Sequence, residues 1–413
     1  MSSAGLLSIE AMNVLATLAL LALSASHLSG EDAVRISLFS LFKPETIHIR
    51  IASGESASLD ATGLAGIRPV GRGELIRIRL SGGRLSILVS GPLARAQSPA
   101  TATAARIAPA GSATIELVLP GRIKREVRGV VSVDAGPGGR GPLRIVLETD
   151  RESAVAAIVA AETSRRETEA LKALAVVVRT YMLANAGRHS SEGFDFCDTT
   201  HCQLYRGEQD LSDRVASAAV ANAVARTAGQ VLRFEGRTVE GFYNAACGGI
   251  SATPSMVWGG SSNYPYSRIA CRWCHSSKFD TWERSARAAD ILGSLSSIMS
   301  SNLSSATELI TDTEQPSGFV RAVTVGDGSR RVVLSTDAFR RAIGLRLGWN
   351  TVLSPTFTVE RRGARFIFRG RGFGSQIGLC EAGAFAQAAA GRSYREILNF
   401  YYPGADLSER PSP

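Results

Sequence analysis

Two cysteines and a histidine fall within six residues in the segment 197–205, which reads CDTTHCQLY. Zinc prefers thiolate and imidazole ligands, and four of them close a structural zinc site. Cys197, His201 and Cys202 would therefore need one further ligand. His189 is the nearest candidate along the chain. The alternatives are a disulfide between the two cysteines, or unconnected thiols beside a solvated histidine, because a short Cys/His tract does not decide between them.

Helices and strands alternate from about residue 151 onward. Apolar residues at 171, 174, 175, 178 and 182 follow helical spacing, which predicts a helix packed on a core. A second helix is expected over 213–228, ended by a glycine. Later elements are expected as strands at 231–235 and 238–243, a helix after Trp282, a strand at 319–325, a helix near 338–343, and strands at 357–360 and 365–368. Residues 151–413 are therefore predicted to form a mixed helix-and-strand domain.

The preceding stretch, residues 31–150, reads as one strand after another. Ile47–Ile51 and Leu75–Leu80 alternate apolar with polar side chains, as half-buried strands do, and the Gly-Gly pair at 82–83 predicts a hairpin turn. A Pro/Ala/Ser/Thr stretch at 98–113 is expected to be a long loop. The chain as a whole thus predicts an α+β fold, with a small β-rich domain that serves as a scaffold or positions a glycan.

Residues 1–30 have features of an export signal. Ala11–Leu23 is apolar, small residues follow it, and Ala25 is a candidate cleavage position. The usual positive charge before the apolar run is missing, so translation could begin at Met12, or the segment could stay uncleaved as an anchor. Either way the rest of the protein is expected to be exported to the cell wall or periplasm, touching the membrane only through this segment.

The charge of the chain narrows the class of partner. Forty-six basic against thirty-seven acidic residues give a net charge of +9. This excess favours anionic surfaces such as cell-wall polymers or lipid headgroups. Nucleic acid is not expected as a partner, because no compact Lys/Arg run or aromatic recognition motif is present. Most of the positive charge is scattered arginine, which is typical of a solvated surface.

Residues 159–205 read VAAETSRRETEALKALAVVVRTYMLANAGRHSSEGFDFCDTTHCQLY. This segment resembles the signature of the stage II sporulation protein D (SpoIID) family, in which a glutamate precedes a helix EALKAQAVAARTYAL and then CDTTHCQVY. Further family-like blocks follow in order, namely GFYNAACGG at 241–249, VWGG at 257–260, GRGFGSQIGLC at 370–380 and YREILNFYYPG at 394–404. The resemblance implies action on peptidoglycan, since the best-known member is a lytic transglycosylase and relatives are known as amidase enhancers.

Glu162 occupies the position of the family's catalytic glutamate. It follows the apolar run 154–161, an environment that favours a protonated carboxyl and so a general acid. The family's Glu-Met-Pro is replaced here by Glu-Thr-Ser. The rivals Glu167 and Glu169 lie at a helix start, where a carboxylate is usually a dipole or capping partner.

The glycine-rich blocks are expected to line a glycan-binding groove. Glycines permit close approach of the backbone, and aromatic and amide side chains can stack on sugars or bond their hydroxyls. The family usually carries a histidine and a glycine where this chain has Ser375 and Gln376. Trp258 is equally consistent with a buried core position. The predicted substrate contacts are Arg179, Tyr181, Tyr243, Asn244, Gly248, Gly249, Ser375 and Gln376.

Cys271, Cys274 and His275 match the haem-attachment pattern C-x-x-C-H. Nothing else in the sequence points to electron transfer, so a disulfide or a second structural metal site is favoured over haem. Cys247 and Cys380 could supply two more thiols, but the sequence does not fix how the four are paired.

These observations favour a lytic transglycosylase that cleaves the MurNAc–GlcNAc bond to leave 1,6-anhydromuramyl ends. Glu162 would serve as acid and base, and a structural zinc would brace the loop near Cys197. The alternative is a non-catalytic cell-wall-binding enhancer of an N-acetylmuramoyl-L-alanine amidase. An exported haem protein remains a third hypothesis, which rests only on the C-x-x-C-H pattern.

Overall fold

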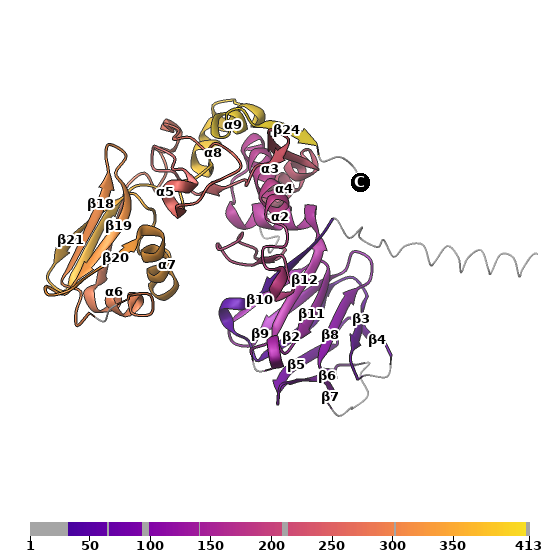
Figure 1. The fold of residues 1–413 in the computed structure, drawn as a ribbon. Coiled ribbons are helices and arrows are strands. Elements are labelled where there is room, and N and C mark those ends of the chain that lie inside the picture. The colour runs from indigo at the N-terminus through magenta and orange to yellow at the C-terminus, as the bar shows by residue number, and fades with distance from the viewer. Residues whose placement is uncertain are drawn as a thin grey trace, which may run out of the picture. The chain divides into compact units, whose positions relative to one another are not determined.

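A computed structural model describes residues 32–63, 66–92, 99–139, 141–208, 214–300 and 303–409. The chain divides into two compact units, each discontinuous in sequence. The first takes its described residues from Met1–Ala161 and Gly187–Asp210, and the second from Glu162–Ala186 and Leu211–Pro413. Both contain helices and strands, so the fold is α+β as predicted (Figure 1). The predicted export signal, residues 1–30, lies outside the described residues.

The first unit contains two large sheets (Figure 1). The seven-stranded sheet has the order β13 (Phe196–Cys197), β1 (Ala33–Leu38), β12 (Arg144–Asp150), β11 (Val130–Asp134), β8 (Ala104–Pro109), β3 (Ser56–Ala61) and β4 (Arg68–Gly71). The six-stranded sheet has the order β10 (Ile123–Val127), β9 (Thr114–Leu119), β2 (Thr46–Ser53), β5 (Leu75–Ser81), β6 (Arg84–Ser90) and β7 (Ala100–Ala102). Because side chains alternate along a strand, each sheet turns an aliphatic face inward.

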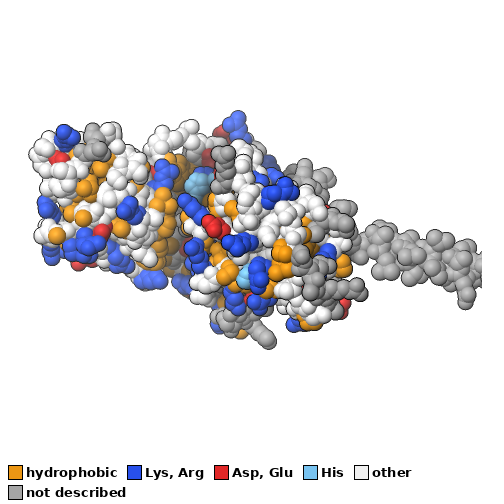
Figure 2. All heavy atoms as spheres, turned by 90° about the horizontal axis from the view of Figure 1, so that it is seen from below, with side chains coloured by type: hydrophobic (Ala, Val, Ile, Leu, Met, Phe, Trp, Pro, Cys, Tyr) orange, Lys and Arg blue, Asp and Glu red, His pale blue; other side chains and the backbone are white. Residues whose placement is uncertain are grey.

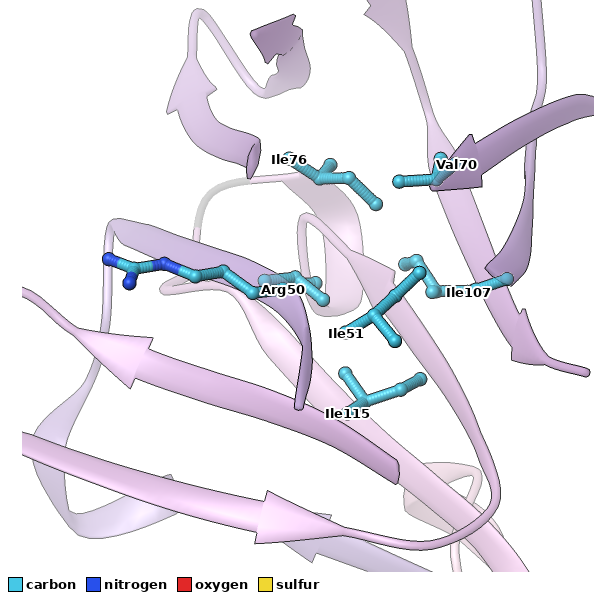
Figure 3. Close-up of a pocket in the computed structure, with 8 residues that line it drawn as sticks. Arg50, Ile51, Val70, Ile76, Ile107 and Ile115 are labelled. Atoms are coloured by element: carbon cyan, nitrogen blue, oxygen red, sulfur yellow. The ribbon is translucent and has the colours of Figure 1, made fainter. Parts of the chain in front are cut away.

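A small cavity lies between these two inner faces (Figure 3). Ile51, Ile76 and Ile115 reach it from the six-stranded sheet, and Val70 and Ile107 reach it from the other. Its lining is almost wholly aliphatic, as expected for a gap in a hydrophobic core. It offers no set of polar groups that would orient a glycan.

The hairpin predicted at 82–83 is confirmed, since both glycines have positive φ, 57° and 78°, between β5 and β6. The loop predicted at 98–113 is wrong, because this stretch contains β7 and β8. β8 pairs with β3 on one side and β11 on the other, and it buries Ala105 and Ile107. Small residues hid the alternation in the sequence, and pairing on both sides compensates for their weak strand preference.

Helix α3 (Thr168–Ala184) is the centre of the second unit. It packs against α4 (Arg214–Ala225), α8 (Glu381–Ala389), α9 (Tyr394–Tyr401) and strand β14 (Gln230–Phe234). The helix predicted from residues 171–182 is confirmed, and it is buried on nearly every side from 170 to 182. Neighbours on all sides explain why its apolar character extends beyond one stripe. None of the helices in the described residues has the length and apolarity needed to cross a membrane.

Two small sheets complete this part of the second unit. One has the order β15 (Arg237–Thr238), β14 and β24 (Asp406–Glu409), and the other pairs β16 (Tyr243–Asn244) in parallel with β23 (Leu379–Cys380). The β16–β23 pair matters most for function. It joins two segments that are more than 130 residues apart, and α8 begins directly after it.

Residues 282–370 of the second unit have their own hydrophobic core. Two three-stranded sheets surround it together with α6 (Ala288–Leu295) and α7 (Thr336–Leu347). The strands are β17 (Trp282–Arg287), β22 (Arg365–Gly370) and β21 (Phe357–Arg362) in one sheet, and β18 (Glu308–Glu314), β19 (Phe319–Gly326) and β20 (Arg331–Ser335) in the other. The strands and helices predicted in this stretch are confirmed.

Basic side chains are dispersed over the surface. Figure 2 shows Lys and Arg scattered over one face among hydrophobic and polar side chains. Among the described residues of the whole protein, some arginines are paired locally, as in Arg144–Asp134 at 2.8 Å and Arg331–Glu308 at 2.7 Å. The excess positive charge on this face is therefore spread out, as the scattered arginines of the sequence predict.

Candidate functional site

Glu162, Tyr243 and Glu381 form a carboxylate cluster within the second unit. Glu162 is the last residue of α2 (Arg151–Glu162), Tyr243 lies in β16, and Glu381 is the first residue of α8. The Tyr243 hydroxyl donates a hydrogen bond to Oε1 of Glu162 at 3.2 Å. The parallel register pairs Tyr243 with Leu379, two residues before Glu381. Three distant segments thus converge on one point.

The approach of β16 to α3 depends on a glycine. Gly241 has a φ of 64°, and a Cβ at this position would lie 2.7 Å from the backbone nitrogen of Tyr181 in α3. Only a residue without a side chain fits such a contact while adopting a left-handed backbone. The sequence motif GFYNAACGG therefore contains the residue that lets Tyr243 reach its position.

The carboxylate cluster is electrostatically unusual. Glu381 is 8% exposed, and its burial, followed by the negative charge of Glu162, raises its pKa well above the ordinary value. Burial and then the charges of Glu162 and Glu381 raise the pKa of Tyr243 as well. Two carboxyls in such proximity resist simultaneous ionisation. The cluster therefore retains a proton at a pH where isolated carboxyls would lose theirs.

Aromatic side chains extend from this cluster to the surface. The ring of Tyr181 lies edge-on to that of Phe242, with ring centroids 6.3 Å apart, and Trp258 contacts Phe242 at 4.9 Å. Trp258 ends the short helix α5 (Pro254–Trp258) and is 46% exposed. This exposure excludes the core position that the sequence left open for Trp258. An exposed indole that packs against Phe242, the neighbour of Tyr243 in the chain, is suited to stacking on a sugar ring.

Arg179, a predicted substrate contact, is almost fully enclosed. It is 2% exposed, and its Nη1 donates to the backbone carbonyl of Gln230 at 3.1 Å. The guanidinium therefore ties α3 to β14. These are the contacts of a structural residue, and they do not support direct binding of a substrate.

Asn244 lies beside Tyr243 and is also buried. Its Nδ2 donates to the carbonyls of Ile377 and Leu379 at 3.0 and 3.2 Å. Its Oδ1 is enclosed and accepts no hydrogen bond from any residue that the structure describes. The Asn244 side chain thus links β16 to the segment before α8 through its NH₂ group.

The glycine-rich blocks form tight turns. Gly248 and Gly249 have φ values of 70° and 101°, and a Cβ on Gly248 would lie 2.8 Å from the Arg371 backbone. Gln376 is buried, with its Nε2 donating to the carbonyl of Cys247 at 2.9 Å and its Oε1 accepting from Thr356 at 2.8 Å. Its amide therefore holds two loops together.

Ser375, next to Gln376, is half-buried and accepts a hydrogen bond from the backbone of Ile377 at 3.3 Å. Of the predicted site residues, Tyr243 thus meets Glu162 directly. Tyr181 lies nearby through Phe242, and Asn244 and Ser375 border the same strands. Glu381 is the residue that sequence reasoning missed. A glutamate in the first turn of a helix is usually a dipole partner, so its position alone gave no signal.

His189, Cys197, His201 and Cys202 form a second group, the His/Cys cluster, within the first unit. Their ligand atoms all lie within 4.8 Å of one another. The Cys202 Sγ lies 3.3 Å from both the Cys197 Sγ and the His189 Nε2, and His201 Nδ1 lies 3.6 Å from each sulfur. The four residues that the sequence predicted as metal ligands are thus brought together.

The loop that carries Cys197, His201 and Cys202 is fixed at its start. β13 pairs in parallel with β1, placing Cys197 opposite Ser37. The buried carboxylate of Asp198 accepts from the backbone nitrogen of Phe39 at 2.8 Å and pairs with Arg125. The neighbouring thiol of Cys202 hydrogen-bonds Cys197 and lowers the pKa of Cys197 to about 4. A thiolate is therefore available at this position.

The donor set fits a zinc ion. Two sulfurs and two imidazole nitrogens are what tetrahedral zinc prefers. The other ring nitrogen of His189, Nδ1, lies 2.6 Å from the carboxylate of Glu192, and its ring stacks on Phe194 with centroids 5.0 Å apart. Such a carboxylate fixes the tautomer and orientation of a metal-binding histidine.

Part of the chain matches a known protein family. Residues 140–234 match the family model described as stage II sporulation protein (SpoIID). The matched range contains Glu162 and the whole His/Cys cluster.

Similar proteins occur in several bacteria. The chain is 28% identical over 240 residues to an uncharacterised protein of Brachyspira hyodysenteriae, covering 58% of this chain and 61% of that one. It is 26% identical over 286 residues to an amidase enhancer of Bacillus subtilis, covering 58% and 38%. It is 27% identical over 273 residues to a stage II sporulation protein D of Bacillus amyloliquefaciens, covering 63% and 75%. The chain thus spans less than two thirds of the length of the first two relatives.

Proposed function

Since the chain belongs to the SpoIID family, we propose that it acts on the cell wall as a peptidoglycan lytic transglycosylase. The observation that carries this proposal is the contact between Glu162 and Tyr243 beside the buried carboxyl of Glu381. Cleaving a glycosidic bond requires a proton donor at the bridging oxygen, and a carboxyl in a partly enclosed site supplies one.

Glu162 is the proposed acid and base. When the proton that the carboxylate cluster retains is on Glu162, this carboxyl donates it to the oxygen between MurNAc and GlcNAc, and the bond from that oxygen to C1 of MurNAc breaks. The 6-hydroxyl of the same MurNAc then attacks C1, and the proton of that hydroxyl passes to the Glu162 carboxylate. The products are an anhydromuramyl end and a free GlcNAc hydroxyl, so Glu162 finishes in its starting state.

The different exposure of the two glutamates, Glu162 and Glu381, suggests different roles for them. Glu162 is half-buried and oriented by the Tyr243 hydroxyl, so a glycan can reach it. Glu381 is more enclosed, so its role is to set the polarity around Glu162. We expect the exposed ring of Trp258 to stack on a sugar.

A zinc ion held by His189, Cys197, His201 and Cys202 would be structural. Four protein ligands leave no open coordination position for chemistry. The ion would fix the loop after β13, which Asp198 and Arg125 already anchor.

The central test compares two matched substitutions. Glu162→Gln keeps the shape of the side chain but removes the acid, so release of anhydromuramyl products from denuded glycan should fall about 10²- to 10⁴-fold. Glu167→Gln is the control, because Glu167 lies in the same segment but pairs with Arg165. Full activity of Glu162→Gln would overturn the assignment of the acid.

A third variant separates the two carboxyls. Glu381→Gln keeps the shape of the side chain and removes the carboxyl that competes with Glu162 for a proton, so most activity should remain. A loss equal to that of Glu162→Gln would instead make both carboxyls participants. Reducing ends in place of anhydromuramyl ends would then indicate a hydrolase, which uses two carboxyls and water.

A second candidate function is stimulation of a cell-wall amidase. Its support is the name of one relative, the amidase enhancer, and the use of the Gln376 amide in holding loops together. The unmutated protein would then bind glycan and increase the rate of an N-acetylmuramoyl-L-alanine amidase without releasing anhydro products. A binding assay on the same denuded glycan distinguishes this outcome from a misfolded preparation.

Action on peptidoglycan requires the protein to leave the cytoplasm. We therefore propose that residues 1–30 direct export, as a cleaved signal or as an anchor. Fusing residues 1–40 to a reporter that is active only outside the cytoplasm tests this. A silent fusion, started at either Met1 or Met12, would contradict it.

A further inference from the structure

The second unit contains a group of four cysteines that the proposed reaction does not use. Cys247 follows β16, Cys271 directly precedes the short 3₁₀ helix η5 (Arg272–Cys274), Cys274 is the last residue of η5, and Cys380 ends β23. We call this group the cysteine cluster. All four side chains are free and no more than 1% exposed. Their sulfur atoms all lie within 4.8 Å of one another.

The spacing of the sulfurs is that of metal ligands. The Cys247 and Cys274 sulfurs are 3.6 Å apart. A disulfide requires about 2.05 Å, whereas sulfurs at the corners of a tetrahedron around zinc, each about 2.3 Å from the ion, lie about 3.8 Å apart. Four mutually close sulfurs in a buried interior form a preorganised set of four thiol ligands.

The surroundings are suited to negative charge on sulfur. The backbone nitrogens of Cys247 and Gly383 donate to the Cys380 Sγ at 3.3 and 3.4 Å, and the Tyr401 hydroxyl lies 3.3 Å from the Cys271 Sγ. Cys380 is also the N-cap of α8, where the helix dipole favours an anion. Such donors offset the charge that four thiolates would carry around a divalent ion.

The packing leaves the cluster little freedom. A Cβ on Gly383 would lie 2.9 Å from the Cys271 Sγ, and closer still to the Tyr401 hydroxyl. On the other side, Gln376 holds the carbonyl of Cys247. Contacts with the surrounding residues therefore hold the sulfurs in place.

We propose that the cysteine cluster binds one zinc ion, separate from the His/Cys cluster. Zinc is the divalent ion that four thiolates in a tetrahedral arrangement select most commonly in structural sites. Binding replaces four S–H protons by four Zn–S bonds, and the protons pass to solvent. No redox partner is required.

The same geometry accounts for the C-x-x-C-H motif. The two thiols of the motif are buried and turned toward Cys247 and Cys380. His275 is exposed, with its Nδ1 2.9 Å from the carboxylate of Asp280. Covalent attachment of haem needs both thiols to be accessible. The motif therefore supplies two of the four proposed zinc ligands instead.

The ion would connect three segments of the second unit. It would link the turn after β16, the η5 turn and the start of α8, and Glu381 follows Cys380 directly. The site is thus a positioning element for the carboxylate cluster. The assignment of zinc does not rest on the proposed transglycosylase activity, because metal content is measured without substrate.

The decisive measurement is the zinc content of the full-length protein, purified under reducing conditions without chelator. The unmutated chain should carry about two zinc ions, one for each four-ligand cluster. A Cys197→Ser/Cys202→Ser double variant should keep about one, and Cys247→Ser should also keep about one. Retention of no zinc by the Cys197→Ser/Cys202→Ser double variant would overturn the proposal, as would iron in place of zinc.

A second measurement applies if Cys247→Ser fails to fold. The Cys197→Ser/Cys202→Ser variant, which leaves the second unit intact, is exchanged with cobalt(II). The proposal expects intense sulfur-to-cobalt charge-transfer bands and the visible bands of tetrahedral cobalt. Absence of these bands, with the four remaining cysteines unreactive toward a thiol reagent in denaturant until reduced, would mean two disulfides and would overturn the metal site.

Discussion

The His/Cys cluster takes all four side chains from one segment, residues 189–202, whereas the cysteine cluster collects its thiols from positions 247 to 380. His201 of the first is exposed, while every member of the second is buried. The first lies on a loop that a sheet already supports. The second lies where three segments meet, and the Cys247 nitrogen bonds a sulfur 133 residues away.

The distance in sequence between the ligands of each cluster therefore determines which part of the protein a bound metal would stabilise. Closing a short segment removes little chain entropy, and other contacts already hold that loop through Asp198. A metal in the cysteine cluster would instead join distant segments inside the second unit, so its loss would disturb the packing of much of that unit. We therefore expect the cysteine cluster to govern the stability of the second unit, and the His/Cys cluster to govern local order in the first.

The largest effect is expected for Cys274→Ser. Structural zinc contributes about 10–16 kcal/mol of binding free energy, comparable with the about 5–15 kcal/mol that stabilises a whole protein. Losing one ligand should therefore unfold much of the second unit, while the strands of the first stay protected. Hydrogen exchange measured by mass spectrometry checks this. Equal loss of protection in both units would contradict the comparison.

A smaller and more local effect is expected for Cys202→Ser. Zinc should be lost from the His/Cys cluster, and amide exchange should rise in residues 197–205. The strands β1 and β12 should keep their protection, because their pairing is independent of the loop. The exposed His201 also predicts that a chelator strips this site from the unmutated protein first. Earlier loss of zinc from the buried cluster would reverse the expected order.

Gly383→Ala tests the close packing around the cysteine cluster. The new methyl group would press on Cys271 and Tyr401, and overpacking of this kind costs about 1–3 kcal/mol. The control is Gly293→Ala in α6, where a Cβ meets only the flexible end of Arg346. That control should be neutral or slightly stabilising, by up to about 1 kcal/mol. Chemical denaturation measures both, and equal effects would indicate that the cluster is loosely packed.

The smallest effect is expected for Glu192→Gln. Its carboxylate orients His189 and makes the imidazole a better ligand. Loss of such a partner typically weakens metal binding 10- to 100-fold. Because Glu192 is largely exposed, we expect about tenfold, measured by competition with a zinc indicator. The zinc in the cysteine cluster should be unaffected, and a change there would show that the two sites are not independent.

Prediction from sequence succeeded where the signal was local. The hairpin at 82–83 and helix α3 depend on neighbours in the chain, and both predictions are confirmed. The four side chains of the His/Cys cluster also lie close together, as the sequence predicted, while their role as zinc ligands stays a prediction. The strand β8 was missed, because its small residues gain their stability from pairing with β3 and β11. Glu381 was missed because only the fold shows that a first-turn glutamate is buried beside Glu162.

The sequence by itself determined the resemblance to the SpoIID family, the α+β class, the candidate acid Glu162 and the thiol and imidazole groups that could hold metal. It did so because motifs, periodicity and ligand type are written in short stretches of chain. Only the tertiary structure showed that the buried side chains of Arg179 and Gln376 link separate segments, that Trp258 is exposed, and that four distant cysteines meet. Those outcomes depend on burial and on contacts between remote segments, which no local pattern encodes.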